Sequence, residues 1–170
     1  MITLIIGPMF SGKTTELLRR LNRDRIAGKK VILIRNNIDK REILTHDNLS
    51  FGQIKVIITK ILSEIDVSGY DVIGIDEGQF FDDLMTANIW ANLGKNIMIA
   101  GLDATSEQKP FGKILNIIPF CEEVLKLNAV CHKCGSYNAS FTYFKGNNKR
   151  SDVLIGSENE YEARCRKCMF

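Results

Sequence analysis

Short apolar runs alternate with amphipathic segments along the first 127 residues of the chain. The runs are rich in Ile, Leu and Val, as buried parallel strands are, and they occupy residues 4–6, 31–34, 54–58, 72–75, 97–100 and 124–127. Between them, apolar residues recur at helical spacing at Leu17, Leu18, Leu21 and Ile26, and again at Phe81, Leu84, Met85, Ile89 and Trp90, which we expect to point inward. Gly28 and Gly94 follow these two segments, where helices commonly end. The pattern predicts an α/β fold, with helices covering both faces of a mainly parallel sheet.

The sequence also predicts shorter elements and a change in the residue pattern near the C-terminus. We expect a brief helix near residues 59–65, another helix opening at 109–112, and a long surface loop over the polar stretch 36–53. Near residue 128 the alternation stops, and the run 140–144, followed by Gly146-Asn147-Asn148, predicts a hairpin with 153–155. We therefore divide the chain into an α/β domain, residues 1–127, and a small lobe, residues 128–170.

Composition limits the classes of function. The 170 residues are 45% hydrophobic and 25% charged, which is ordinary for a globular protein of one domain with a small appendage. No apolar run approaches the roughly 20 residues of a membrane span, and the first residues lack the basic start of a signal peptide, so we expect a cytoplasmic protein without a membrane partner. The net charge of +3 is too mild for the clustered basic face of a duplex-DNA binder.

A phosphate-binding motif lies between the first predicted strand and the first predicted helix. Its eight residues match G-x-x-x-x-G-K-[ST] in full: Gly7, Pro8, Met9, Phe10, Ser11, Gly12, Lys13 and Thr14. In such a P-loop, backbone N–H groups converge on phosphate oxygens, the lysine reaches the β- and γ-phosphates, and the hydroxyl ligates Mg²⁺. The alternative is a plain glycine-rich turn. The position between strand and helix favours a site for ATP and Mg²⁺.

An acidic pair, Asp76-Glu77, ends the predicted strand 72–75. P-loop proteins hold Mg²⁺ with an aspartate at such a strand end, and the adjacent Glu77 would accept a proton from an attacking hydroxyl. The alternative is a solvated turn that carries two charges. The P-loop upstream favours the functional interpretation.

Four of the five cysteines form two C-x-x-C pairs, Cys131 with Cys134 and Cys165 with Cys168. In a cytosolic chain, such pairs favour metal over disulfides, and four thiolates complete a closed tetrahedral site for structural Zn²⁺. A redox pair is the alternative. His132 is expected to be a bystander, and Cys121 a buried apolar residue.

Together these features resemble the zinc-containing thymidine kinases of animals, many bacteria and poxviruses. The resemblance covers nearly the whole chain and rests on motifs in a fixed order: residues 7–14, Asp39-x-Arg41, 45–47, 73–81, 102–103, 109–111, 126–131 and 155–168. It implies a P-loop, RecA-like α/β fold with a C-terminal zinc-ribbon lobe and a lasso loop. It also implies a short, poxvirus-like form without the C-terminal tail of animal relatives.

The resemblance further implies an activity, the ATP-dependent phosphorylation of the 5′-hydroxyl of thymidine to thymidine monophosphate, in nucleotide salvage for DNA synthesis. Glu77 matches the general base, and Asp39, Arg41 and Gln79 match residues beside magnesium and the phosphates. The implied base site comprises the apolar walls Met9, Phe80, Leu102 and Phe111, the lasso residues Asp152, Val153, Leu154, Ile155 and Gly156, and Tyr161. A homotetramer inhibited by thymidine triphosphate is implied as well.

The chain departs from the family pattern at Ser106, where relatives often carry a pocket aromatic, and at Ser157, where they carry a second glycine. Ser106 therefore leaves open the alternative that the protein is a broader pyrimidine deoxynucleoside kinase, which also accepts deoxyuridine. A zinc-ribbon ATPase acting on nucleic acid is the alternative of another class, with Phe141, Tyr143 and Phe144 as a stacking platform beside Lys145, Lys149 and Arg150. An inactive relative that serves as a binding module is a third.

Overall fold

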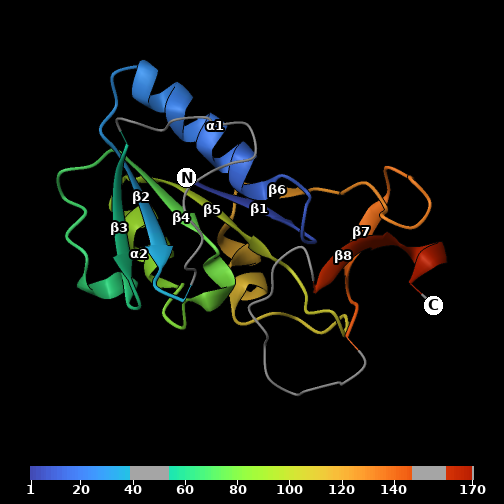
Figure 1. Ribbon diagram of the computed structural model, residues 1–170. Helices are drawn as coiled ribbons and strands as arrows, with labels where there is room; N and C mark the ends of the chain where they lie inside the picture. Colours follow the sequence, from blue (N-terminus) through green and yellow to red (C-terminus); the bar gives the residue numbers. More distant parts are fainter. Residues whose placement is uncertain (39–53, 147–159, 170) are drawn as a thin grey trace.

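Six parallel strands form the central sheet of the protein, which is represented by a computed structural model that describes residues 1–38, 54–146 and 160–169 (Figure 1). The strands are β1 (Ile2–Gly7), β2 (Val31–Asn36), β3 (Lys55–Thr59), β4 (Val72–Asp76), β5 (Asn96–Leu102) and β6 (Glu123–Lys126). They lie in the order β3-β2-β4-β5-β1-β6, and every neighbouring pair is parallel. The predicted mainly parallel sheet is confirmed.

Helices cover both faces of this sheet. On one face, α1 (Lys13–Ile26) buries Leu17, Leu18 and Leu21 against the strands. Gly74 of β4 permits this close packing, because a Cβ at that position would collide with the Leu21 side chain. The other face packs against α2 (Thr86–Asn92) and the 3₁₀ helices η1 (Leu62–Glu64) and η3 (Ile114–Phe120). Two apolar cores result, one on each side of the sheet. The ribbon shows α1 and α2 on opposite sides of the strands (Figure 1).

The helix predicted after Asp76 is shorter than its apolar spacing suggested. Residues 78–80 form a 3₁₀ turn, η2 (Gly78–Phe80), and the α-helix begins only at Thr86. A helix that begins there buries Ala87 and Trp90, whereas Ile89 is 60% exposed. The prediction that Met85 and Ile89 point inward was therefore wrong, because the helical count began too early. The helix expected to open at 109–112 is η3, which begins at Ile114.

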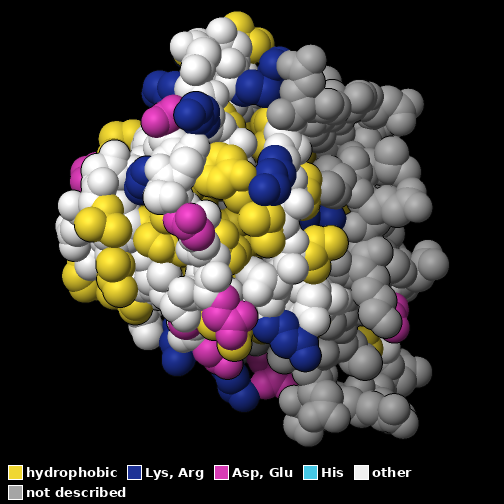
Figure 2. All heavy atoms as spheres, turned by 90° about the vertical axis from the view of Figure 1, so that its left-hand side faces the viewer, with side chains coloured by type: hydrophobic (Ala, Val, Ile, Leu, Met, Phe, Trp, Pro, Cys, Tyr) yellow, Lys and Arg dark blue, Asp and Glu magenta, His cyan; other side chains and the backbone are white. Residues whose placement is uncertain are grey.

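The β3 strand forms one edge of the sheet, and the face at that side carries hydrophobic side chains among scattered charges (Figure 2). Ile58 of β3 is 65% exposed and Ile61, just after it, is 42% exposed. Among the helices that the structure describes, none is long and apolar enough to cross a membrane.

The C-terminal lobe contains a second sheet of two antiparallel strands, β7 (Ala139–Phe144) and β8 (Tyr161–Cys165), followed by the 3₁₀ helix η4 (Arg166–Cys168). The predicted hairpin partner, residues 153–155, lies outside the described residues, and the strand that pairs with β7 is β8. That pairing sets Ala139 opposite Cys165 and brings the second cysteine pair back to the first. The lobe begins after β6, and the division of the chain at residue 127 stays a proposal.

Candidate active site

Three of the predicted site segments lie at one edge of the sheet. The P-loop follows β1, the Asp76-Glu77 pair ends β4, and Leu102 ends β5. All three strands are parallel, so their carboxyl ends meet at the same edge, where α/β proteins bind ligands. Gly7 and Leu102 are direct neighbours in the β1–β5 register. The fold therefore assembles the site from segments that are up to 95 residues apart in the chain.

The P-loop backbone takes a conformation that depends on glycine. Gly7 has φ +151° and Gly12 has φ +78°, both in the range that side chains other than hydrogen disfavour. A Cβ on Gly7 would also collide with the backbone carbonyl oxygen of Leu127, just after β6. Gly12 directly precedes α1, so the loop leads into the positive end of the helix.

Replacing Gly7 with alanine is expected to weaken the binding of magnesium–ATP by tenfold or more, because the added Cβ has no room beside the Leu127 carbonyl and the loop must shift. Gly28→Ala is the matched control, since Gly28 also has a positive φ, +84°, but its Cβ would meet open space. The control should lower the melting temperature slightly and leave the ATP affinity unchanged, as titration calorimetry and thermal unfolding would show. Equal ATP affinities for the two variants would contradict the steric explanation.

The two polar residues that close the P-loop make well-defined contacts. The Lys13 ammonium donates to the Pro8 carbonyl oxygen at 2.6 Å and lies 3.5 Å from the Ser11 hydroxyl, so the cation lies across the loop. The Thr14 hydroxyl donates to Asp76 Oδ1 at 3.0 Å. This contact joins the end of the P-loop to the end of β4. It places a hydroxyl and a carboxylate together, which suits a magnesium ion with oxygen ligands.

Asp76 is buried, at 3% exposure, between two partners. Its Oδ1 accepts from Thr14, and its Oδ2 lies 3.8 Å from Nε of Arg35, the register neighbour of Asp76 on β2. Arg35 is itself only 7% exposed. The sequence reasoning missed Arg35, although a lone charge in the apolar run 31–36 was a signal that a buried partner existed.

Glu77 is held in a fixed orientation. It is 8% exposed and adopts φ +54° and ψ +45°, a left-handed conformation that costs a non-glycine residue on the order of 1–3 kcal/mol. The Gln79 amide donates to Glu77 Oε2 at 2.6 Å, and the Gln79 Oε1 accepts from the Leu102 N–H at 2.9 Å. Gln79 thus bridges β5 to the carboxylate. Strained backbone held by such a network is a feature of functional sites.

Another missed residue supports the turn after Glu77. The Asn36 side chain at the end of β2 is 2% exposed and donates to the Phe80 carbonyl oxygen at 3.0 Å. Next to it, the rings of Phe80 and Phe111 meet edge-on, with centroids 5.5 Å apart and an interplanar angle of 86°. Two of the four predicted apolar walls are therefore in direct contact.

The other predicted pocket residues come from several segments. Leu102 is half-buried at the end of β5, where its N–H donates to Gln79, and Met9 is half-buried in the P-loop. Ser106 is half-buried in the loop after β5, and no hydrogen bond among the described residues joins it to the other pocket residues. Tyr161 lies on β8, where its ring packs 5.3 Å from that of Phe144 and burial raises the pKa of its hydroxyl. The remaining predicted site residues lie outside the described part of the chain: Asp39, Arg41, Asp152, Val153, Leu154, Ile155 and Gly156.

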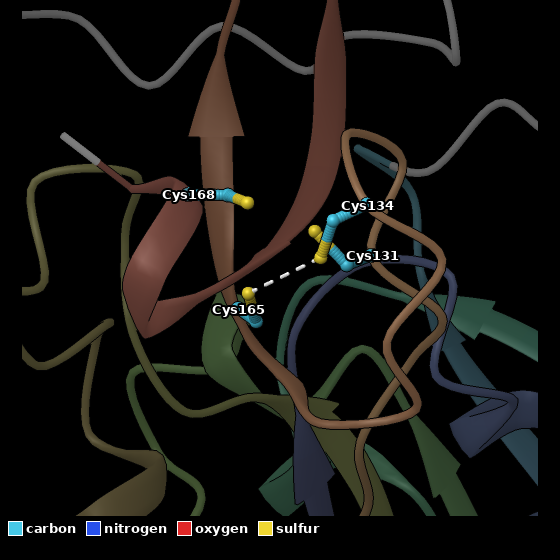
Figure 3. A group of neighbouring side chains, drawn as sticks. All are labelled: Cys131, Cys134, Cys165 and Cys168. Carbon is cyan, nitrogen blue, oxygen red and sulfur yellow. Dashed lines mark hydrogen bonds between the residues drawn. The ribbon is translucent and has the colours of Figure 1, made fainter.

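The four paired cysteines form one cluster, as predicted (Figure 3). Their Sγ atoms all lie within 4.8 Å of one another, and those of Cys134 and Cys165 are 3.7 Å apart. A tetrahedral zinc with Zn–S bonds of 2.3 Å needs sulfur atoms about 3.8 Å apart, so the cluster fits this ion. Cys131, Cys165 and Cys168 are buried, and Cys134 is exposed.

The thiols also show the electrostatics of a site for a cation. Backbone N–H groups, that of Cys165 foremost, lower the pKa of the Cys131 thiol to about 6, whereas hydrogen bonding to Cys134 and burial raise the pKa of Cys168 to about 12. Four crowded thiols cannot all ionise without a positive charge among them. A zinc ion would supply that charge.

The aromatic residues proposed as a nucleic-acid platform already have partners within the lobe. The Arg164 guanidinium lies 3.3 Å from the centre of the Tyr143 ring, and that of Arg166 lies 4.8 Å from the Phe141 ring. Phe144 packs against Tyr161. Each ring thus has a side-chain contact within the lobe, which reduces the ring surface left for a stacked base.

The sheet is parallel, with a P-loop after β1 and an acidic pair at the end of β4. These features define a P-loop α/β protein, to which a lobe with a cysteine cluster is added. Comparison with known proteins narrows the class. Residues 1–169 match the family model described as thymidine kinase. The chain is 47% identical to a thymidine kinase of raccoon poxvirus over 98% of its length and 95% of the relative's. It is 44% identical to those of vaccinia virus (strain Western Reserve) and sheeppox virus (strain KS-1), over 98% and 99% of its length and 95% and 96% of theirs.

The chain belongs to the thymidine kinase family, and it is accordingly an enzyme, a phosphoryl transferase. The resemblance read from its motifs is confirmed.

Proposed function

We propose that the protein transfers the γ-phosphoryl group of ATP to the 5′-hydroxyl of thymidine and releases thymidine monophosphate. One observation carries the proposal most directly. In a chain of this family, the Thr14 hydroxyl at the end of the P-loop donates a hydrogen bond to Asp76, and the next residue, Glu77, is buried. This arrangement supports the assignment of a phosphate cradle, a set of magnesium ligands and a general base to one edge of the sheet.

The donor side of the reaction belongs to the P-loop. Backbone N–H groups of residues 7–12 and the Lys13 ammonium bind the phosphates of ATP. Thr14 and Asp76 hold Mg²⁺, with Asp39, Arg41 and Gln79 assigned nearby by the family pattern. When bound, magnesium neutralises charge on the transferring phosphoryl oxygens. Arg35 orients Asp76 from β2.

The acceptor side depends on Glu77. Its carboxylate accepts the proton of the 5′-hydroxyl as that oxygen attacks the γ-phosphorus, while ADP leaves. The hydrogen bond from the Gln79 amide orients the Glu77 carboxylate for this proton transfer. The constrained backbone of Glu77 limits the movement of that carboxylate, which favours a reactive geometry.

The base of the nucleoside is assigned to the apolar group beside Glu77. Met9, Phe80, Leu102 and Phe111 surround the thymine methyl group, with Ser106 and Tyr161 at the border. The family pattern also assigns residues 152–156, which lie outside the described part of the chain, to the binding of the base.

Further properties follow the family. The four cysteines hold a structural Zn²⁺, whose site leaves no open ligand position. We propose a cytoplasmic homotetramer that serves nucleotide salvage and is inhibited by thymidine triphosphate in the acceptor site. Membrane and nucleic-acid partners play no part in this function.

A nucleoside panel tests the proposal. With zinc-loaded protein, ATP and Mg²⁺, thymidine should be phosphorylated at least tenfold faster than deoxycytidine or any purine nucleoside, as measured by chromatography of the monophosphates. Lys13→Ala is the control, because it removes the phosphate-binding ammonium and should abolish turnover. Equal rates with deoxyuridine would favour the broader pyrimidine kinase, and a Ser106→Phe variant would then test the pocket. Failure of a folded, zinc-loaded protein to phosphorylate any nucleoside would overturn the proposal.

A further inference from the structure

The cysteine lobe touches the phosphate loop directly. The Met9 N–H donates to the hydroxyl of Thr142 on β7 at 3.1 Å, across 133 residues of chain. Next to it, the ring of Phe10 packs on the ring of His132, with centroids 5.2 Å apart. Phe10 also packs against the small core of the lobe, which is formed by Ala129, Cys131, Ala139, Ala163, Cys165 and Cys168. Two successive P-loop residues thus rest on the lobe.

These contacts hold a part of the loop that needs support. Phe10 has φ +64°, a left-handed conformation that a bulky residue rarely adopts and that persists only where the surroundings impose it. The Met9 N–H would lack this acceptor if the lobe moved away. The loop geometry around Met9 and Phe10 is therefore not determined by the sequence of the loop alone.

The supporting residues are themselves anchored at one point of the lobe, the backbone of Ala163. Ala163 faces Thr142 in the β7–β8 register. It also makes two hydrogen bonds with His132: the His132 N–H donates to the Ala163 carbonyl oxygen at 3.0 Å, and the Ala163 N–H donates to His132 Nδ1 at 3.2 Å. Thr142 is 6% exposed. The lobe thus presents a preformed support to the loop.

The cysteine cluster connects the two segments that carry these supporting residues. His132 lies between Cys131 and Cys134, and Cys165 follows two residues after Ala163 on β8. Joining the two cysteine pairs through one ion therefore fixes His132 and Ala163 relative to each other. His132 lies inside a C-x-x-C pair but is not a member of the cysteine cluster. This arrangement gives it a role as a support for the P-loop.

We propose that Thr142 and His132 are positioning residues for the triphosphate, and that closure of the cysteine cluster organises the phosphate-binding loop as well as the lobe. The inference rests on the proposed function only in that the P-loop binds ATP. It predicts that the lobe contributes to the affinity for ATP even when no nucleoside is present, although none of its described residues belongs to the P-loop.

Three variants on β7 test the hydrogen bond. Thr142→Val removes the hydroxyl at nearly constant shape and should raise the Kd for magnesium–ATP about tenfold, because the Met9 N–H loses its acceptor. Thr142→Ser keeps the hydroxyl and should restore the affinity. Ser140→Ala is the matched control, since the Ser140 hydroxyl donates to Asn128 within the lobe, at 2.8 Å, and should leave the Kd unchanged. Calorimetry without nucleoside gives the Kd, and zinc content and melting temperature are measured on the same samples.

A fourth variant tests the ring contact separately. Asparagine at position 132 can still accept a hydrogen bond from the Ala163 N–H but cannot pack against Phe10, so His132→Asn should retain zinc and bind ATP about threefold to tenfold more weakly.

If Thr142→Val and His132→Asn both retained zinc and bound ATP as tightly as the wild type, the inference would be overturned. The contacts would then serve only the stability of the lobe. A lower melting temperature without a change in Kd would also overturn the inference. Failure of the proposed function would look different: thymidine would not be phosphorylated by the unmodified protein, yet its ATP affinity would still depend on Thr142.

Discussion

Replacing Glu77 with glutamine is expected to lower kcat for thymidine by roughly 10²–10⁴-fold while the affinities for ATP and thymidine change little. Glutamine keeps the size of the side chain, and its amide oxygen can still accept the hydrogen bond from Gln79. The left-handed backbone and the buried position of residue 77 are therefore retained. What is lost is the ability to accept a proton. Single-turnover kinetics with saturating ATP, together with calorimetric binding of both substrates, separates these effects.

Two further variants sharpen that experiment. Glu77→Asp keeps the carboxylate but draws it back by one methylene, so a partial loss between those of the wild type and the glutamine variant is expected. Glu64→Gln, a change in η1 on the α2 side of the sheet, serves as the control and should leave kcat unchanged. If the glutamine variant kept kcat within about threefold of the wild type, Glu77 would not be the general base, and the role would pass to a solvent molecule or to another carboxylate.

The second large effect concerns the metal. Cys165→Ser is expected to abolish zinc binding, to lower the melting temperature markedly and to reduce thymidine phosphorylation by about 100-fold or more. Cys165 is buried at the end of β8, and its sulfur lies 3.7 Å from that of Cys134, so a serine there removes a central member of the cluster. A structural zinc site supplies apparent binding energies on the order of 10 kcal/mol in small domains, which a two-stranded sheet cannot replace. Metal analysis, thermal unfolding and the kinase assay give the three readouts.

Cys121→Ser is the matched control for that variant. Cys121 is half-buried rather than fully buried as expected, its thiol donates to the Ile117 carbonyl oxygen, and burial raises the pKa of the thiol to about 11, so it is an inert thiol outside the cluster. This variant should keep its zinc and its activity. Retention of zinc and of the melting temperature by Cys165→Ser would contradict the structural metal site, and sensitivity of the unmodified protein to thiol reductants would then support the redox alternative.

Much of this site could be predicted from the sequence because its chemistry lies in short contiguous stretches. The P-loop, the Asp76-Glu77 pair and the two C-x-x-C pairs each carry their residues within eight positions. The hydrophobic runs between them predicted the parallel sheet, since strands buried on both faces tolerate few polar residues. Family membership followed from the order of these motifs and was confirmed.

Other features required the packed chain. The spacing of apolar residues after Asp76 is helical, yet the chain forms a 3₁₀ turn there, because the hydrogen bonds of Asn36 and Gln79 hold the turn close to the sheet. The polar alternation of β8 is a weaker strand signal than the apolar run 153–155, yet β8 is the strand that pairs with β7 and brings Cys165 to Cys134. Local propensity gives no information about such distant partners.

The sequence by itself determined the chemistry that the protein carries: a phosphate loop, an acidic pair, a four-cysteine cluster and the family to which they belong. Only the tertiary structure decided how these parts support one another. The pairing of Arg35 with Asp76, the bridge from Leu102 through Gln79 to Glu77, and the contacts of Thr142 and His132 with the P-loop join residues that are distant in the chain. Such contacts depend on strand order and register, which are set by the burial of whole faces and leave no local pattern to read.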